Sequence, residues 1–177
     1  MWKEVIRRMQ LQKDAITLSD ADFLRLIEEK GDSFYRVAYG YVRNAEDAKD
    51  IVQEAVCKAY VGKARLKDRE KFYPWFYRIL THTAATFLRR HAPSVAWAET
   101  LPEAAVMEEE RWGDTIWVQD SLSRLEAKSR TVIVLKVYEN MTFAEIAQIL
   151  KKSENSVKSL YYRGLKSLKE RMRVHGG

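Results

Sequence analysis

The sequence predicts an all-α protein of two small helical domains joined by a flexible linker, and three observations predict it. Glycine and proline are scarce, at 7 and 3 of 177 residues, while residues that favour helices are plentiful. Apolar residues recur at helical spacing along most of the chain. Between residues 92 and 113 this spacing is lost, and the segment contains two prolines and an acidic run, as linkers do. The predicted domains therefore cover residues 17–91 and 114–174.

The first domain is expected to contain four helices, at about residues 19–30, 32–43, 44–60 and 72–90. Ser19 and Asn44 each precede an acidic residue by three positions, which predicts that they cap their helices. The apolar side of the first helix is assigned to Phe23, Leu24 and Ile27, and that of the second to Phe34, Val37, Ala38, Tyr41 and Val42. Segment 61–71 is dense in charge and lacks periodicity, so it is predicted to be a loop.

The second domain is expected to end in a helix-turn-helix. Thr142 and Glu145 form a predicted capping box before a short helix over residues 143–150. A brief turn follows, and Ser153 then caps a long last helix. The inward residues of that helix are predicted to be Val157, Tyr161, Gly164, Leu165 and Leu168. Because glycine lowers helix propensity, Gly164 indicates a close helix crossing.

Composition limits the classes of function. Lys and Arg number 31 against 25 acidic residues, which gives a net charge of +6 and fits nucleic acid, an acidic partner or simply a solvated surface. The single cysteine, Cys57, excludes a disulfide framework and is expected to be a small packed side chain. No apolar run is long enough to span a membrane, and the N-terminus does not resemble a signal peptide. We therefore expect a cytoplasmic protein without a cofactor or structural metal.

Three groups of side chains are candidate functional surfaces. The outward face of the last helix is polar and basic, and it can read a DNA major groove; it carries Asn155, Lys158, Ser159, Tyr162, Arg163 and Lys166. The fourth helix and the loop before it combine aromatic and basic residues, as surfaces for single-stranded nucleic acid do; they carry Lys63, Arg65, Lys67, Phe72, Tyr73, Trp75, Tyr77, Arg78, His82 and Arg89. From the pattern alone, Phe72 is better explained as a core residue.

The third group is the acidic face of the third helix, which holds Asp47, Asp50, Gln53 and Glu54. No histidine or cysteine is placed to complete a metal site with these carboxylates. Two readings of the face stay open at this point. It is either a solvated surface or the docking surface for a basic protein partner.

Three motifs, in this order, resemble one protein family. They are "NAEDAKDIVQEAVCKAY" from Asn44, "FYPWFYRILTHTAATFLRR" from Phe72, and the helix-turn-helix run "SRTVIVLKVYENMTFAEIAQILKKSENSVKSLYYRGLKSLKERM". Together they are similar to the extracytoplasmic-function sigma factors, the smallest members of the bacterial sigma-70 family, and most similar to the Gram-positive subgroup. The resemblance implies a region 2 domain and a region 4 domain, and a promoter-specificity subunit of RNA polymerase that is not itself an enzyme.

The resemblance also implies a partner for each surface. The acidic face would contact the clamp helices of the polymerase β′ subunit. The aromatic and basic surface would open the −10 element and capture an unpaired base. The last helix, with Ser156 added to the residues above, would read the −35 element. The resemblance further implies an anti-sigma factor as a regulator, commonly membrane-anchored in this family, whereas the chain itself would not enter a membrane.

The sequence departs from the family pattern at several positions. Leu160 and Leu165 stand where the family usually has arginine, which is expected to weaken phosphate contacts. Lys49 occupies a usually acidic position next to the acidic face. The turn between the two helices reads "LKKS" and lacks the frequent glycine.

Two other functions remain as alternatives. A stand-alone helix-turn-helix regulator would explain the second domain but neither of the other two surfaces. A helical interaction protein that binds polymerase without opening promoters would explain the acidic face but not the surface around Trp75.

Overall fold

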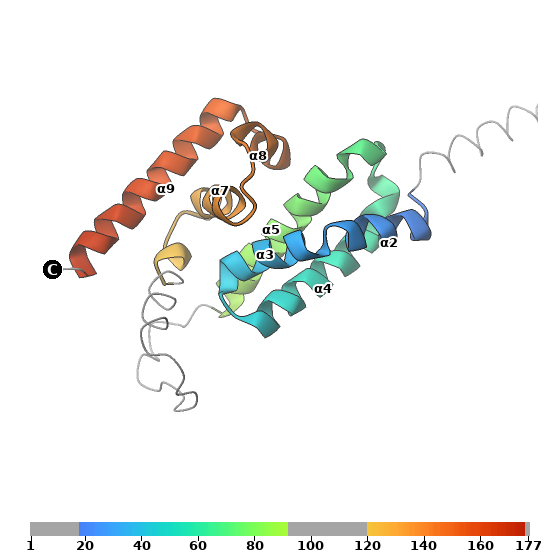
Figure 1. Ribbon diagram of the computed structural model, residues 1–177, viewed down its shortest axis with the longest axis horizontal. Helices are drawn as coiled ribbons and strands as arrows, with labels where there is room; N and C mark the ends of the chain where they lie inside the picture. The colour runs from blue at the N-terminus through green and yellow to red at the C-terminus, as the bar shows by residue number, and fades with distance from the viewer. Residues whose placement is uncertain (1–17, 92–119, 176–177) are drawn as a thin grey trace, which may run out of the picture.

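The computed structural model describes residues 18–91 and 120–175, and every regular element in those ranges is a helix (Figure 1). The N-terminal unit contains α2 (Asp20–Glu29), α3 (Gly31–Val42), α4 (Ala45–Gly62) and α5 (Phe72–His91). The C-terminal unit contains a helical turn at 120–123, α7 (Ala127–Tyr138), α8 (Phe143–Leu150) and α9 (Glu154–His175). The all-α prediction is confirmed, while the predicted linker, 92–113, lies outside the described residues.

Polar side chains start the helices where backbone N–H groups would otherwise lack an acceptor. The Ser19 hydroxyl accepts a hydrogen bond of 3.1 Å from the N–H of Asp22. The Asn44 side chain accepts one of 3.0 Å from the N–H of Asp47. Both predicted caps are therefore confirmed, and they set where α2 and α4 begin.

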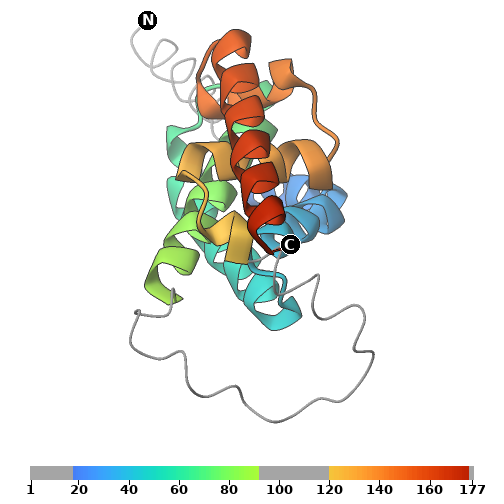
Figure 2. The ribbon, with the colours of Figure 1, turned by 90° about the vertical axis from the view of Figure 1, so that its left-hand side faces the viewer.

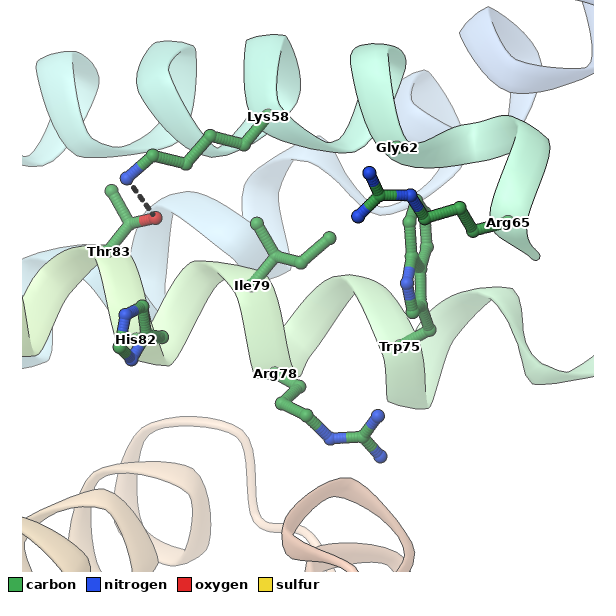
Figure 3. A pocket seen from close by; sticks show the side chains of 8 residues that line it. All are labelled: Lys58, Gly62, Arg65, Trp75, Arg78, Ile79, His82 and Thr83. Atoms are coloured by element: carbon green, nitrogen blue, oxygen red, sulfur yellow. Dashed lines mark hydrogen bonds between the residues drawn. The ribbon is translucent and has the colours of Figure 1, made fainter.

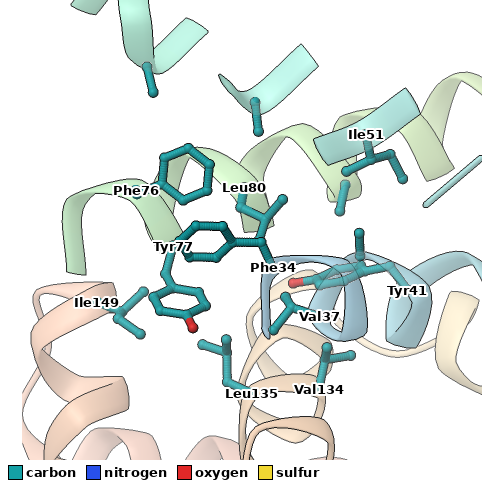
Figure 4. Packing of buried hydrophobic residues seen from close by; sticks show 14 of the residues in the cluster. Phe34, Val37, Tyr41, Ile51, Phe76, Tyr77, Leu80, Val134, Leu135 and Ile149 are labelled. Atoms are coloured by element: carbon teal, nitrogen blue, oxygen red, sulfur yellow. The ribbon is translucent and has the colours of Figure 1, made fainter. Parts of the chain in front are cut away.

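The core of the N-terminal unit forms where α3 packs against α4 and α5. The predicted apolar stripe of α3 is buried as expected. The ring centroids of Phe34 and Phe76 are 4.3 Å apart. Ile51 of α4 and Leu80 of α5 complete this packing (Figure 4). These contacts hold α4 and α5 side by side, which positions the surface described below.

In the C-terminal unit, α7 is buried along a continuous run from Ser129 to Leu135. A helix that is apolar on more than one side must be covered on more than one side. One side of α7 packs against α9, where a Cβ atom at Gly164 would lie 2.5 Å from Cδ1 of Ile133. The close helix crossing predicted from Gly164 is thus present.

The other side of α7 faces the N-terminal unit. Figures 1 and 2 show α7 and α8 lying between α9 and the N-terminal helices, with α9 outermost. α3 contacts α7 and α5 contacts α8. Val134, Leu135 and Ile149 belong to the same apolar cluster as the N-terminal core (Figure 4). The two units are therefore in direct contact.

The structure corrects four expectations about packing. Leu24 is 57% exposed, and Leu26, three residues after Phe23, is buried instead. Cys57 is exposed, because the buried stripe of α4 runs through alanines on another side of the helix. Leu165 is exposed as well, and the inner side of α9 uses Leu160. Segment 61–71 is partly helical, since α4 continues to Gly62 and two 3₁₀ turns follow.

Among the described residues, no helix is long and apolar enough to cross a membrane.

Candidate functional site

The acidic face of α4 is open to solvent. Asp50 and Gln53 are exposed, and Asp47 and Glu54 are partly exposed, so all four predicted residues lie on the surface of one helix. Glu54 forms an ion pair of 2.6 Å with Lys58, one turn further along α4. Within residues 18–91 and 120–175, no ion pair engages Asp47 or Asp50. Their charges are therefore available to a partner.

Lys49 does not neutralise this face. Its Nζ atom lies 2.8 Å from Oε1 of Glu46, and this hydrogen bond raises the pKa of Lys49. Lys49 and Glu46 are both exposed, and their opposite charges pair with each other. The departure from the family pattern at Lys49 thus leaves Asp47 and Asp50 unobstructed.

A pocket of about 420 Å³ opens between α4 and α5 (Figure 3). Among the described residues that line it none is acidic, and three are cationic: Lys58, Arg65 and Arg78. The indole of Trp75 forms an apolar wall, 3.5 Å from the position that a Cβ atom of Gly62 would take. An aromatic wall with a cationic rim can stack a base and hold a phosphate.

This pocket brings together Arg65, Trp75, Arg78 and His82 of the predicted −10 surface. It also includes Lys58, which is not among the residues predicted from the sequence. Helical spacing alone could have placed Lys58 and Gly62 together, because Lys58 precedes Gly62 by one helical turn and therefore lies on the same side of α4. The sequence could not show that α4 and α5 pack so that these sides meet.

Other predicted −10 residues lie outside the pocket. Lys63 forms an ion pair with Asp20 and lies over the ring of Tyr60, which holds its charge against α2. Lys67 and Arg89 are exposed. Tyr73 is partly buried, with Nζ of Lys30 4.6 Å from its ring centroid.

Phe72 and Tyr77 require a correction. They are 1% and 3% exposed, and both pack in the apolar core. Burial raises the pKa of Tyr77 to about 12, which keeps its phenol neutral. Neither ring has a face on which a base could stack, so we remove both from the candidate surface.

Arg78 bridges the two units. Its Nε atom donates a hydrogen bond of 2.7 Å to the carbonyl of Ile149, and Nη2 donates one of 3.2 Å to the carbonyl of Gln148. Those carbonyls belong to the last turn of α8, where a helix offers free acceptors and a negative dipole end. Figure 3 shows the guanidinium directed out of the pocket toward the C-terminal unit.

The helix-turn-helix forms as predicted. Thr142 and Glu145 make a complete capping box, and the Ser153 hydroxyl accepts a hydrogen bond of 3.2 Å from the N–H of Ser156. Lys151 makes the turn in the left-handed region, with φ 51° and ψ 48°. Lys151 lies in the turn that lacks the glycine frequent in the family, and glycine is the residue that favours that conformation.

The outward face of α9 carries the predicted −35 residues. Six of them are exposed: Asn155, Ser156, Ser159, Tyr162, Arg163 and Lys166. Lys158 is partly buried and pairs with Glu154 at 3.0 Å. Arg163 pairs with Glu126 at 3.3 Å. Leu160 is a core residue, so the arginine usual at this position could not fit here without repacking.

Among residues 18–91 and 120–175, no group of three or more His, Cys, Asp or Glu side chains is placed to hold a metal ion.

The two units match two family models. Residues 26–93 match the model described as "Sigma-70 region 2", and residues 115–168 match "Sigma-70, region 4". Curated relatives match over most of their length. RNA polymerase sigma factor SigV of Bacillus subtilis (strain 168) is 35% identical over 144 residues, which cover 81% of this chain and 86% of the relative. ECF RNA polymerase sigma factor SigW of the same organism is 32% identical over 169 residues, covering 85% and 89%.

Solved structures share the fold. CnrH, in complex with the cytosolic domain of CnrY, aligns with a TM-score of 0.65 at 21% identity, covering 88% of this chain and 90% of the other. The sigma factor RpoE, in complex with the anti-sigma factor NepR from Bartonella quintana, aligns with a TM-score of 0.59 at 20% identity, covering 86% and 98%.

Proposed function

Because this chain belongs to the extracytoplasmic-function group of the sigma-70 family of RNA polymerase sigma factors, we propose that each of its three surfaces performs one step of promoter recognition. As a sigma factor it directs core RNA polymerase to promoters. Sigma factors are regulatory proteins, so the catalysis belongs to the polymerase, which in bacteria is cytoplasmic.

The acidic face of α4 is the proposed contact with core polymerase. Asp47 and Asp50 present uncompensated charge from a rigid helix, which suits a basic surface such as the one the family resemblance implies on the β′ clamp helices. The partial pairing of Glu54 with Lys58 makes Glu54 a weaker contributor.

The pocket between α4 and α5 is the proposed site for an unpaired base of the −10 element. Trp75 would stack on the base, while Lys58 and Arg65 would hold the backbone. This pocket is the observation that carries the proposal. A regulator that only binds duplex DNA has no use for a cationic aromatic pocket in a separate unit, so the stand-alone alternative is not favoured.

The exposed face of α9 is the proposed reader of the −35 element. Polar and basic side chains project from its first four turns, where a recognition helix meets base edges and phosphates. We further propose an anti-sigma factor as a partner, because one of the similar solved structures is the sigma factor RpoE in complex with the anti-sigma factor NepR.

Transcription from fragmented genomic DNA tests this function. Core polymerase of the host bacterium is used with and without the chain, and the RNA 5′ ends are sequenced. We expect new starts that share a −10 and a −35 motif. Co-elution with polymerase without new starts would instead favour the interaction protein.

Trp75→Ala tests the pocket itself. Loss of base stacking is expected to weaken binding of the opened −10 strand by about 1–3 kcal/mol, roughly 5- to 150-fold. The measurement is open-complex formation at a promoter found by that transcription experiment. The control is Leu24→Ala, which removes an exposed apolar side chain from α2. Equal activity of the two variants would contradict the assignment of Trp75.

A further inference from the structure

The acidic face and the pocket lie along one side of α4. Residues three and four apart are neighbours on a helix surface, so a series with these spacings forms one row. Five residues of α4 form such a row: Asp47, Asp50, Glu54, Lys58 and Gly62. The first three belong to the acidic face, and the last two line the pocket. Glu54 and Lys58 therefore lie where the two surfaces meet.

Lys58 makes a contact on each side of this boundary. Its Nζ atom lies 2.6 Å from Oε1 of Glu54 on the acidic face. The same atom donates a hydrogen bond of 3.3 Å to Oγ1 of Thr83, which lines the pocket (Figure 3). The side chains of Lys58 and Glu54 are 44% and 43% exposed. Either side chain can therefore exchange its partner for a group of another molecule.

The positive charge of Lys58 is a large part of what the pocket can offer to DNA. Three cations line the pocket, but Arg78 uses two of its donors on carbonyls of α8. This leaves Lys58 and Arg65 to bind a phosphate. While the carboxylate of Glu54 is paired with the ammonium of Lys58, the pair carries no net charge. A phosphate at the pocket is then attracted less strongly.

We infer that Glu54 couples the polymerase contact to the −10 pocket by holding Lys58. In the free chain, Glu54 competes with a DNA phosphate for the ammonium of Lys58. When a basic side chain of core polymerase binds Glu54, Lys58 is released to the DNA. Coupling between two ligands is reciprocal, so DNA that binds Lys58 also frees Glu54 for polymerase. The inference rests on the proposed function for the identity of the two ligands.

Three substitutions separate this ion pair from a general effect of charge. Glu54→Gln removes the partner of Lys58 and keeps a side chain of the same size. Asp50→Asn removes an equal charge one turn earlier in the same row, and it is the matched control. Lys58→Met keeps an unbranched side chain and removes the ammonium. All three side chains are exposed or partly exposed, so each variant is expected to fold.

The probe is a single-stranded oligonucleotide that carries the non-template strand of a −10 element found by the transcription experiment. Its affinity for the full chain is measured over a range of salt concentrations. Other basic surfaces also attract DNA, so the part of the binding that Trp75→Ala removes is assigned to the pocket. The measurement is then repeated on each variant in the presence of an excess of core polymerase.

In the free chain, we expect Glu54→Gln to tighten binding at the pocket about twofold more than Asp50→Asn does, which corresponds to one ion pair between successive helical turns. The slope of log affinity against log salt should steepen by up to about 0.7, as one added phosphate contact on a single strand predicts. In the Lys58→Met background, Glu54→Gln and Asp50→Asn should have equal effects, because no ammonium remains to be released.

In the complex with core polymerase, Glu54→Gln and Asp50→Asn should have equal effects even when Lys58 is present, because polymerase already occupies Glu54. An extra tightening by Glu54→Gln that persists in this complex would contradict the coupling. The inference is also overturned if Glu54→Gln tightens binding to the free chain no more than Asp50→Asn, or if its extra effect survives Lys58→Met.

Failure of the proposed function gives a different result. If the pocket does not bind the −10 strand, Trp75→Ala and Lys58→Met both leave the affinity for the oligonucleotide unchanged, in the free chain and in the complex with polymerase. That outcome removes the pocket as a DNA site and the inference with it. A pocket that binds DNA through Trp75 and Lys58 but ignores Glu54 overturns the inference alone.

Discussion

At the scale of one residue, Arg163 shows how a side chain of the proposed −35 surface is held in the free chain. Its Nη1 atom lies 3.3 Å from Oε2 of Glu126, and both side chains are at least half exposed. Exposed ion pairs contribute little, about 0–1 kcal/mol. The pair therefore orients Arg163 at low cost and competes only weakly with a DNA partner.

We expect Arg163→Ala to weaken binding of a −35 element by about 1–3 kcal/mol if the side chain makes a bidentate contact with a base. Glu126→Gln should leave binding unchanged or strengthen it, because it frees the arginine. Both are measured as holoenzyme affinity for promoter and mutated-promoter DNA. Equal promoter use by wild type and Arg163→Ala would remove Arg163 from the reading face.

Lys151 carries a conformational cost in the turn between α8 and α9. A side chain in the left-handed region costs roughly 1–2 kcal/mol, which glycine avoids, although glycine loses more entropy on folding. We therefore expect Lys151→Gly to raise the free energy of unfolding by up to about 1 kcal/mol. Urea unfolding checks this, with the exposed and non-strained Lys152→Gly as the control, which should be neutral or destabilising.

At the scale of the element, α8 depends on its capping box. The Thr142 hydroxyl accepts from the N–H of Glu145 at 3.2 Å, and the Glu145 carboxylate accepts from the N–H of Thr142 at 2.7 Å. The hydrogen bond from the Thr142 backbone holds the pKa of Glu145 below its ordinary value. A short helix of eight residues has few other bonds to define its start.

Thr142→Ala is expected to lower the free energy of unfolding by about 1 kcal/mol. Glu145→Gln tests how the free energy of unfolding depends on pH through this carboxylate. Because the folded pKa is depressed, the charged carboxylate stabilises the fold above the unfolded pKa of about 4.3, and this contribution is lost as pH falls through the folded value. The difference in stability between wild type and Glu145→Gln should therefore shrink as the pH falls below about 4. A difference that does not change with pH would contradict the carboxylate's role.

At the scale of the whole molecule, the surfaces lie on different sides of a two-unit body. The acidic face is on α4 and the proposed −35 surface is on α9, with α7 and α8 between α9 and the N-terminal unit (Figures 1 and 2). If both proposed assignments hold, one protein contacts polymerase and DNA at the same time. Binding both DNA elements through one polymerase complex raises the effective concentration of each domain at its site.

Asp50→Arg tests the polymerase contact. Reversing an exposed charge should leave the free energy of unfolding within about 0.5 kcal/mol, as surface substitutions do. The affinity for core polymerase should fall at least severalfold, with a reduced salt dependence. Glu28→Arg, the same reversal on exposed α2, is the control. Equal loss in both variants would show a general charge effect and not a docking surface.

Much of the fold and part of the site could be predicted because they depend on local pattern. The caps at Ser19 and Asn44 and the exact span of α8 follow from side-chain chemistry and helical spacing alone. The buried face of α2 was predicted wrongly because neighbouring apolar residues can each be assigned to it: Leu24 was predicted to be buried, and Leu26 is buried instead. Tyr77 was misplaced because an aromatic side chain near a functional surface looks the same in sequence whether it lines the surface or packs beneath it. The pattern placed Phe72 in the core, as the structure does, and only the family resemblance assigned it to the surface.

The sequence by itself determined that the protein is helical, where its helices start, and which family it resembles, since these depend on residues close together in the chain. Only the tertiary structure decided that Lys58 joins Arg65 and Trp75 at one pocket and that Arg78 is held by carbonyls of α8. It also decided that Glu139 and Ser33, 106 residues apart, meet between the two units. Such contacts depend on how helices pack in space. The spacing of apolar residues shows which face of a helix is buried, but it does not show which other helix packs against that face.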